Sequence, residues 1–284
     1  MKIVVTGGSG LVGTFVLQEL KDRHELMVLD RHAPKIKGMP FVKGDILDLD
    51  ACRKTFEGAD AVIHLAAIRD PLNDPPERVM HVNVMGTFMV HQAAVDAGVR
   101  RVVQASSDAT YGLVFSTRAF SPEYLPLDEE HPQRPQDPYG LSKVVGEEIA
   151  RSFTRKCGLE TVAVRICFVW LPEQAEMYAP LTRDPEEPKW MKGLWIYTHA
   201  WDAARAFRLA AEAPGIEYEA FLISAADNGT VYDTMDLVRR FYPGDIPLKR
   251  KLVGKASLAD WSKAKKILGY EPRYTWRDIV SDEG

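Results

Sequence analysis

A glycine-rich segment near the N-terminus constrains the fold more strongly than any other feature of this chain. Residues 6–13 read TGGSGLVG and lie between an apolar run and a stretch with apolar residues at helical spacing. Glycines at these intervals permit a tight turn and let the backbone approach a pyrophosphate, whose charge the free N–H groups of a helix N-terminus can meet. The context therefore predicts a dinucleotide site between a strand and a helix, with the glycine spacing readable from Gly7 or from Gly8.

Short apolar runs alternate with helical patterns through about the first 170 residues. Strands are predicted at residues 2–6, 25–30, 41–43, 61–66, 101–105 and 161–168, and helices near residues 48–56, 78–97 and 139–156. This alternation is typical of parallel strands joined by crossover helices. The sequence therefore predicts the α/β class, with a Rossmann-type doubly wound parallel sheet.

The pattern changes after Trp170. Four prolines in residues 171–192 are expected to break helices and central strands, which predicts a cap: Pro172, Pro180, Pro185 and Pro188. Residues 200–213 read as a helix and residues 219–225 as a strand, and the segment from Asn228 onward looks irregular. We therefore expect an NAD-binding Rossmann domain at residues 1–170, to which residues 197–225 return, and a small substrate-binding cap at residues 171–196 and 226–284.

Two acidic residues at predicted strand ends bear on the choice of cofactor. Asp30 lies 23 residues after Gly7, where an acidic side chain accepts hydrogen bonds from the adenosine ribose hydroxyls, so NAD is favoured. Three cations follow and could receive a 2'-phosphate, which keeps NADP as the less favoured alternative: Arg31, Lys35 and Lys37. Asp45 ends the third strand, where its carboxylate could accept from the adenine amino group or form a strand-end turn.

Three residues form a candidate catalytic set. Tyr139 and Lys143 lie four residues apart on a predicted helix, so their side chains share one face. A tyrosine, with an ordinary pKa of about 10, is a weak base at neutral pH, and a neighbouring ammonium stabilises its phenolate. Ser107 lies at the carboxyl edge of the predicted sheet, where its hydroxyl could orient a substrate alcohol, whereas Ser106 is interpreted as a capping or turn residue.

Composition and residue spacing exclude several other classes of function. The formal net charge is −4, without a basic run, so nucleic acid and an anionic membrane are not expected partners. No stretch approaches the roughly 18 apolar residues of a membrane span, and the first apolar run is too short for a signal peptide, so a cytoplasmic protein is expected. The three cysteines form no CxxC pair and the histidines no close pair, so no disulfide framework and no metal site are predicted.

Two further groups of residues have competing interpretations. His64 lies inside an apolar strand, which favours a core histidine with satisfied hydrogen bonds over a ligand. An aromatic group could stack on a sugar ring or pack a small cap: Trp190, Trp195, Tyr197 and Trp201. The sequence leaves the second question open.

These motifs together resemble the extended short-chain dehydrogenase/reductase superfamily, in its NAD-dependent epimerase/dehydratase group. The resemblance covers nearly the whole chain. Its strongest matches are TGGSGLVG at residues 6–13, GDILD at 44–48, HLAA at 64–67, VNVMGT at 82–87, ASSDATYG at 105–112 and DPYGLSK at 137–143.

The resemblance implies a role for each candidate residue. Ser107, Tyr139 and Lys143 would form the catalytic triad, and Asn83 would be a structural or proton-relay residue near the nicotinamide. The implied cofactor-binding residues are Gly7, Gly10, Leu11, Val12, Gly13, Asp30, Arg31, Asp45, Ile46, Leu65, Ala66, Ala67, Asn83, Tyr139, Lys143 and Ile166. Substrate binding is expected of Ser107, Asp108 and Phe168, and a homodimer through a shared four-helix interface is also implied.

This chain departs from parts of the family pattern. Members that act on nucleotide sugars typically end the sixth strand in RxxNVYGP, whose Asn contacts the phosphates, whereas residues 165–172 here read RICFVWLP, with Phe168 in that place. The cap segment at residues 173–196 is also short, which resembles uronate and aldose dehydrogenases. The dehydratase branch uses an Asp-Glu pair, but Asp108 is followed by Ala109, so dehydration is disfavoured.

The sequence therefore favours an NAD-dependent oxidoreductase that oxidises a hydroxyl of a small sugar or sugar acid. An NAD-dependent nucleotide-sugar 4-epimerase, similar to UDP-glucose 4-epimerase, uses the same triad and remains the first alternative. A non-catalytic NAD-binding regulatory protein is the second, and the intact triad argues against it.

Overall fold

The computed structural model describes residues 1–242 and 244–280, and within them seven parallel strands form one sheet in the order β3-β2-β1-β4-β5-β6-β9. The strands are β1 (Lys2–Thr6), β2 (Glu25–Asp30), β3 (Phe41–Lys43), β4 (Ala61–His64), β5 (Arg101–Ser107), β6 (Glu160–Ile166) and β9 (Tyr218–Ile223). The strand order reverses its direction between β1 and β4, which places the topological switch point of the sheet there. The predicted α/β class is confirmed.

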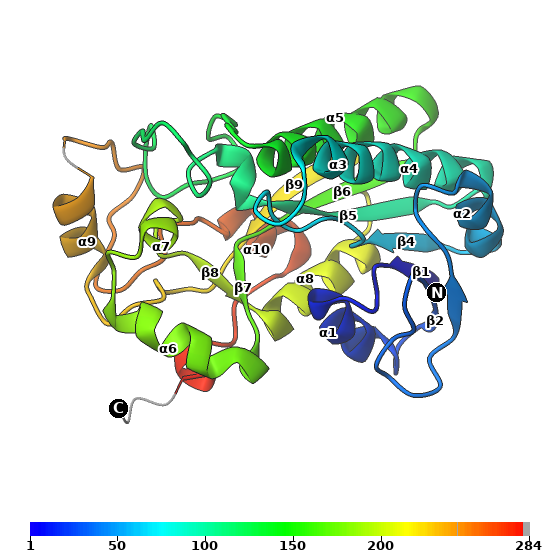
Figure 1. Cartoon of the computed structure of the whole chain (residues 1–284), viewed down its shortest axis with the longest axis horizontal. Coiled ribbons are helices and arrows are strands. Elements are labelled where there is room, and N and C mark those ends of the chain that lie inside the picture. The colour runs from blue at the N-terminus through cyan, green and yellow to red at the C-terminus, as the bar shows by residue number, and fades with distance from the viewer. Residues whose placement is uncertain (243, 281–284) are drawn as a thin grey trace.

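Helices cover both faces of the sheet (Figure 1). On one face lie α1 (Leu11–Leu20) and α8 (Ala200–Glu212), and on the other lie α2 (Leu49–Phe56), α4 (Gly86–Asp96) and α5 (Pro138–Cys157). Ile3 and Val5 pack into the core with α1 and α8, while Val4 between them packs into the core with α2 and α4. Because both faces of the strands are buried, the strands read as continuous apolar runs.

The helical pattern predicted over residues 78–97 is interrupted in the structure. It consists of α3 (Pro76–Met80), a π-helical turn η1 (His81–Met85) and then α4. A π-turn inserts one extra residue into the helix, and here it carries Asn83, which is 2% exposed. The strand predicted at residues 61–66 ends earlier, at His64, although the Leu65 N–H still donates to the Thr6 carbonyl at 2.9 Å.

The strand predicted at residues 161–168 is wrong at its end. β6 stops at Ile166, and the Cys167 N–H is shared between the Ile223 carbonyl of β9 at 3.3 Å and Thr198 Oγ1 at 3.2 Å. β7 (Phe168–Trp170) then pairs in parallel with β8 (Tyr197–His199), a second sheet of two strands within the described residues. The chain therefore leaves the main sheet just before Phe168.

The segment after β7 contains more helix than the prolines led us to expect. It holds η3 (Pro172–Gln174), α6 (Ala175–Arg183) and α7 (Pro188–Lys192). Pro188 occupies the first turn of α7, where its missing N–H has no helical partner to lose. Pro180 lies inside α6 and removes one bond to the carbonyl of Glu176, an exposed residue whose carbonyl can be solvated.

The C-terminal segment also contains helices, α9 (Thr234–Phe241), α10 (Ser262–Leu268) and the short η4 (Trp276–Asp278), where the sequence looked irregular. Parts of this segment share a second apolar core with the region around α6 and α7, on the opposite side of Figure 1 from β1 and β2. Residue 243 and residues 281–284, which belong to the predicted cap, lie outside the described residues. Within the described residues, no helix is long and apolar enough to cross a membrane.

Candidate active site

The carboxyl ends of the parallel strands bring the predicted site residues to one edge of the sheet. Thr6 pairs with His64, so the turn after β1 lies beside the chain that follows β4. Ser107 pairs with Ile166 at the ends of β5 and β6. Ligands of open α/β sheets bind at this edge, near the switch point between β1 and β4.

The glycine turn is packed closely against its neighbours. Gly7 has a φ of +73°, and a Cβ atom there would lie 2.5 Å from the main-chain nitrogen of Ala66, so only glycine fits. A Cβ atom on Gly13 would lie 2.3 Å from the Gly7 carbonyl oxygen. Gly13, the last glycine of the motif, therefore lets helix α1 pack closely against the turn. Gly10 is the N-cap of α1, and Leu11 at the helix start is 41% exposed. The structure therefore brings this turn together with residues 65–67.

Asp30 holds the same turn to the end of β2. Its carboxylate accepts hydrogen bonds from the Ser9 N–H at 3.0 Å and from the His32 N–H at 3.1 Å. A pocket lies beside it at the ends of β2 and β3, lined by Arg31, His32, Lys43 and Gly44. Asp30 and the cations Arg31 and Lys43 therefore lie together where the sequence analysis predicts the adenosine of the cofactor.

The residues after β3 take structural roles in the structure. Asp45 accepts from the Leu47 N–H at 3.0 Å, which is the turn-forming role that the sequence left open. Ile46 is 6% exposed, and its side chain packs against Gly86 at the start of α4. Any contact between Ile46 and a cofactor therefore falls to its main chain.

Ser107 and Tyr139 meet at this edge. Ser107 begins the 3₁₀ turn η2 (Asp108–Tyr111), where its Oγ accepts from the Ala109 N–H at 3.1 Å and donates to Asp108 Oδ1 at 3.0 Å. Burial raises the pKa of the Tyr139 phenol above its ordinary value, and a hydrogen bond with Ser107 lowers it. Burial also raises the pKa of Asp108, to about 6. Because its pKa is raised, the Tyr139 phenol is protonated at neutral pH.

Lys143 lies beside Tyr139, one turn further along α5. Its Nζ is 5.5 Å from the centre of the Tyr139 ring and donates to the Ala105 carbonyl at 2.9 Å. Burial lowers the pKa of Lys143 to about 8, and the charge of Glu147 raises it. The sequence predicts that Lys143 lowers the pKa of Tyr139, whereas in the structure burial outweighs every opposing interaction and that pKa is raised.

Asn83 makes three hydrogen bonds that hold the chain around it. Its Oδ1 accepts from the Ile68 N–H at 2.8 Å, and its Nδ2 donates to the Ile68 carbonyl at 2.9 Å and to Ser142 Oγ at 3.0 Å. These bonds fix the chain after β4 against α5. Ile166, partly buried, ends β6 next to Ser107.

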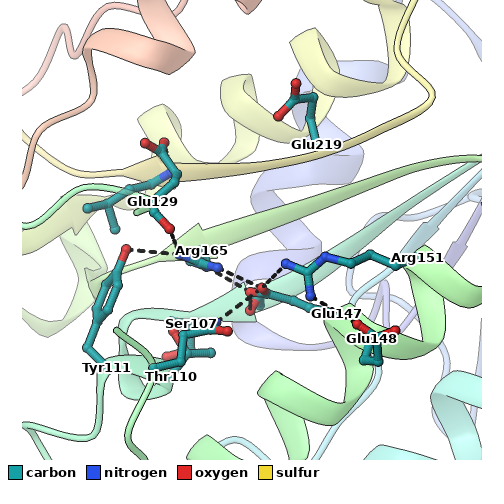
Figure 2. Close-up of polar contacts among 12 residues, drawn as sticks. Ser107, Thr110, Tyr111, Glu129, Glu147, Glu148, Arg151, Arg165 and Glu219 are labelled. Carbon is teal, nitrogen blue, oxygen red and sulfur yellow. Dashed lines mark hydrogen bonds and ion pairs between the residues drawn. The ribbon is translucent and has the colours of Figure 1, made fainter. Parts of the chain in front are cut away.

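A charged network behind the triad escaped the sequence analysis (Figure 2). Glu147, with no exposed side-chain surface, pairs with Arg165 at 2.7 Å and accepts from Ser106 Oγ at 2.6 Å. Ser106 therefore anchors helix α5 and does not simply cap a turn. The signal was the spacing of Tyr139, Lys143 and Glu147, which puts all three on one helix face.

Phe168 lies at the boundary between the site edge and the aromatic core. It is 44% exposed, and its ring makes edge contacts with Trp170, Tyr178 and Trp190. Trp190 is 3% exposed, and Trp195 and Tyr197 have no exposed surface, so these residues pack the core and do not present a face to a sugar.

Two other sequence interpretations can be compared with the structure. Trp201 packs edge-on against Phe15 at 4.9 Å, so it too is a packing residue. His64 is confirmed as a satisfied core histidine, because its two ring nitrogens lie 2.8 Å from Thr6 Oγ1 and 3.2 Å from Thr87 Oγ1. Residues 1–242 and 244–280 contain no group of three acidic, cysteine or histidine side chains that could hold a metal ion.

Comparisons with known proteins identify the family of this chain. Residues 3–224 match the NAD dependent epimerase/dehydratase family. The chain is 32% identical to an L-arabinose 1-dehydrogenase (NAD(P)(+)) of Haloferax volcanii over 80% of this chain and 89% of that protein. It is 30% identical to a UDP-glucose 4-epimerase of Streptomyces lividans over 99% of this chain and 94% of that protein.

The fold is shared with solved structures. A short-chain dehydrogenase/reductase superfamily protein of Agrobacterium tumefaciens, solved with bound NAD, superposes with a TM-score of 0.77 at 24% identity, over 99% of this chain and 95% of that one. The glycine turn and the strand order are thus set in a fold shared with that protein. The chain belongs to the NAD dependent epimerase/dehydratase family, and NAD is its cofactor.

Proposed function

We propose that this protein oxidises a hydroxyl of a small sugar or sugar acid with NAD as hydride acceptor. The observation that carries the proposal is the convergence of Ser107, Tyr139 and Lys143 at the sheet edge that also bears the glycine turn. A hydroxyl side chain, a phenol and an ammonium within one site suit the removal of a proton from an alcohol. The cofactor, when bound, supplies the hydride acceptor.

Each triad residue has a distinct task in this proposal. Ser107 donates a hydrogen bond that orients the oxygen of the substrate alcohol, and Tyr139, once it has lost its own proton to become a phenolate, takes the proton from that oxygen. With NAD bound, the hydride of the same carbon would pass to the cofactor, so the alcohol would become a carbonyl and its oxygen-bound proton would pass to Tyr139. Lys143 holds the ribose hydroxyls and keeps positive charge beside Tyr139, which favours the phenolate that must form.

The cofactor would lie along the sheet edge from the glycine turn to the triad. Gly7, Gly10, Leu11, Val12 and Gly13 would contact the pyrophosphate, and Asp30, Arg31, Asp45 and Ile46 the adenosine. Leu65, Ala66 and Ala67 would contact its central portion, and Asn83, Tyr139, Lys143 and Ile166 the end near the nicotinamide. The close fit of Gly7 against the main chain of Ala66 supports this path, because it brings the glycine turn and residues 65–66 side by side at the sheet edge.

The substrate would lie between the triad and the cap at residues 171–196 and 226–284. Asp108 and Phe168 border that side of the triad, and Phe168 is exposed enough to touch a sugar. Phenylalanine cannot make the phosphate contact that asparagine makes in nucleotide-sugar enzymes. The alignment with the Streptomyces epimerase runs over 321 positions although this chain has 284 residues, so that enzyme carries segments that are missing here. Both facts support a substrate without a nucleotide.

The test is a screen of free sugars, uronates and sugar phosphates with NAD, monitored by the formation of NADH. We expect sustained NADH release with at least one monosaccharide. Calorimetry with UDP and dTDP on the NAD-loaded protein completes the test, and we expect no tight binding. Nucleotide binding that blocks activity would refute this substrate assignment.

A second candidate is nucleotide-sugar 4-epimerisation, because the Streptomyces epimerase aligns with 99% of this chain. An epimerase would oxidise and then reduce the same substrate and would keep its cofactor. Interconversion of UDP-glucose and UDP-galactose without net NADH release would favour it over the dehydrogenase.

We also propose that two copies associate through α4 and α5. Met85, Phe88 and Leu141 on and before these helices are each between 39% and 43% exposed, an unusual amount of apolar surface on neighbouring elements. A two-fold axis would bury both copies of this surface. Sedimentation should show a dimer at micromolar concentration, and Phe88→Glu should give a monomer.

A further inference from the structure

The network behind the triad joins three elements of the fold. Glu147 on α5 accepts from Arg165 on β6 through both carboxylate oxygens, with Nε to Oε1 at 2.8 Å and Nη2 to Oε2 at 2.7 Å. Ser106 on β5 donates to Oε1 at 2.6 Å, and Gln133 donates to Oε2 at 3.1 Å. The carboxylate therefore has four hydrogen bonds in a fully buried position. Figure 2 shows its pairing with Arg165.

The partners of Glu147 are tied down in turn. Arg165 Nη1 donates to the Tyr111 hydroxyl at 3.2 Å and to the Glu129 carbonyl at 3.1 Å. Ser106 directly precedes Ser107, and Glu147 lies one helical turn beyond Lys143. The network thus connects the strand that carries one triad residue to the helix that carries the other two.

Packing α5 against β6 does not by itself require the Glu147–Arg165 ion pair. Buried ion pairs can often be replaced by apolar residues of similar volume without loss of stability. A carboxylate at position 147 has an electrostatic effect that apolar side chains would not have. It lies one helical turn from the ammonium group of Lys143, in a poorly solvated site where charges interact strongly. Burial alone would push the pKa of Lys143 down, and Glu147 opposes that shift.

Other charged groups near Lys143 do not replace Glu147. His64 on β4 is neutral, because burial lowers its pKa well below the ordinary value. Three carboxylates act on the neighbouring phenol of Tyr139: Asp108, Asp137 and Asp70. Glu147 is the group whose charge raises the pKa of Lys143 itself, with Arg165 of β6 behind it and Arg151 of α5 at 3.8 Å.

We propose that Glu147 is a positioning residue: bonded to Ser106 and Arg165, its carboxylate holds the end of β5 against α5 and places a negative charge one helical turn from Lys143. It contacts neither the substrate nor the cofactor in the proposed reaction. The inference rests on the proposed function for its kinetic consequence, whereas its effect on Lys143 can be measured in the protein alone.

The first test measures the titration of Lys143 in the full chain. The protein is labelled with ¹³Cε-lysine, and the Lys143 resonance is identified from its loss in Lys143→Arg. In Glu147→Gln we expect the midpoint to fall by on the order of one pH unit, because one unit charge about one turn away is removed. Glu148→Gln is the matched control. Its carboxylate is exposed and pairs with Arg151 and Arg155, so the midpoint should not move.

The second test is the pH profile of kcat/KM. Activity needs the charged form of Lys143, so it is present below the pKa of that group and is lost as the pH rises through it. Lowering this pKa in Glu147→Gln should move the alkaline limb to lower pH, while a purely structural defect would lower the whole profile without moving the limb. Glu148→Gln should keep the wild-type limb.

A third variant covers the case in which Glu147→Gln does not fold, since it leaves Arg165 buried without its partner. The double variant Glu147→Met with Arg165→Met removes both charges and fills the space with apolar atoms. We expect it to fold and to show a smaller fall in the Lys143 midpoint than Glu147→Gln, because the opposing charge of Arg165 is removed as well. An unchanged midpoint in either folded variant overturns the inference. If wild type oxidises no sugar, the proposed function fails, but the titration still decides the role of Glu147.

Discussion

The glycine turn and the aromatic core around Trp170 are both close-packed, but the turn is fixed mainly by main-chain contacts and the core by side-chain contacts. In the turn, main-chain atoms touch main-chain atoms: a Cβ atom on Gly7 would meet the nitrogen of Ala66, and Asp30 receives two backbone N–H groups. In the aromatic core, Trp170 is fully buried and stacks on Tyr178 with ring centres 4.5 Å apart. Backbone contacts specify a position for a shared cofactor, whereas side-chain contacts can change with the substrate.

The largest effect should come from the catalytic phenol. Tyr139→Phe removes the group that takes the substrate proton and keeps the ring in place, so kcat should fall by about 10³-fold. NAD affinity, measured by calorimetry, should stay within about threefold of wild type if the phenol hydroxyl acts mainly on the substrate. A variant with wild-type biological function and no turnover would instead support the regulatory-protein alternative.

The aromatic core can be tested by comparing a buried ring with an exposed one. Trp170→Ala should lower the free energy of unfolding by about 3–5 kcal/mol, because it leaves a cavity among Tyr178, Trp190 and Tyr197. Phe168→Ala removes a ring that is 44% exposed, so its cost should stay below about 1 kcal/mol. Urea unfolding measures both. If Phe168 contacts the sugar, its variant should raise KM several-fold, and equal KM values would remove it from the substrate site.

The two regions also differ in how far the sequence predicted them. The glycine turn and the doubly wound parallel sheet could be predicted, because they follow from one short glycine motif and from the alternation of apolar runs with helical patterns. The catalytic roles of Ser107, Tyr139 and Lys143 stay predictions. The pairing around the predicted cap could not be predicted, because β7 pairs with β8 across 26 intervening residues and Tyr197 bonds to Asp227 at 2.7 Å. The role of Glu147 on α5 was missed for the same reason, because it depends on an ion pair with Arg165 on β6, which is distant in sequence.

The backbone precision of the turn can be tested with two glycines of similar φ. Gly7→Ala combines a left-handed backbone with a clash against Ala66, so it should lower the free energy of unfolding by about 2–4 kcal/mol. Gly38 has a φ of +79° with nothing within 4 Å of a Cβ atom, so Gly38→Ala should cost about 1 kcal/mol. Equal losses of stability would show that conformational strain, and not the close approach to Ala66, limits position 7.

The smallest predicted effect concerns the adenosine end of the same turn. Asp30 places a negative charge beside the ribose, while Arg31 and Lys43 line the neighbouring pocket. Asp30→Asn removes the repulsion of a 2'-phosphate but keeps a side chain that can accept from the Ser9 N–H, so folding should be preserved. The preference for NAD over NADP, measured as the ratio of kcat/KM values, should fall by about 10-fold, which corresponds to about 1.4 kcal/mol. Arg31→Ala is the complementary variant and should weaken NADP more than NAD. A ratio that does not change in Asp30→Asn would mean that this carboxylate serves only to hold the turn, and that the cations set the cofactor preference.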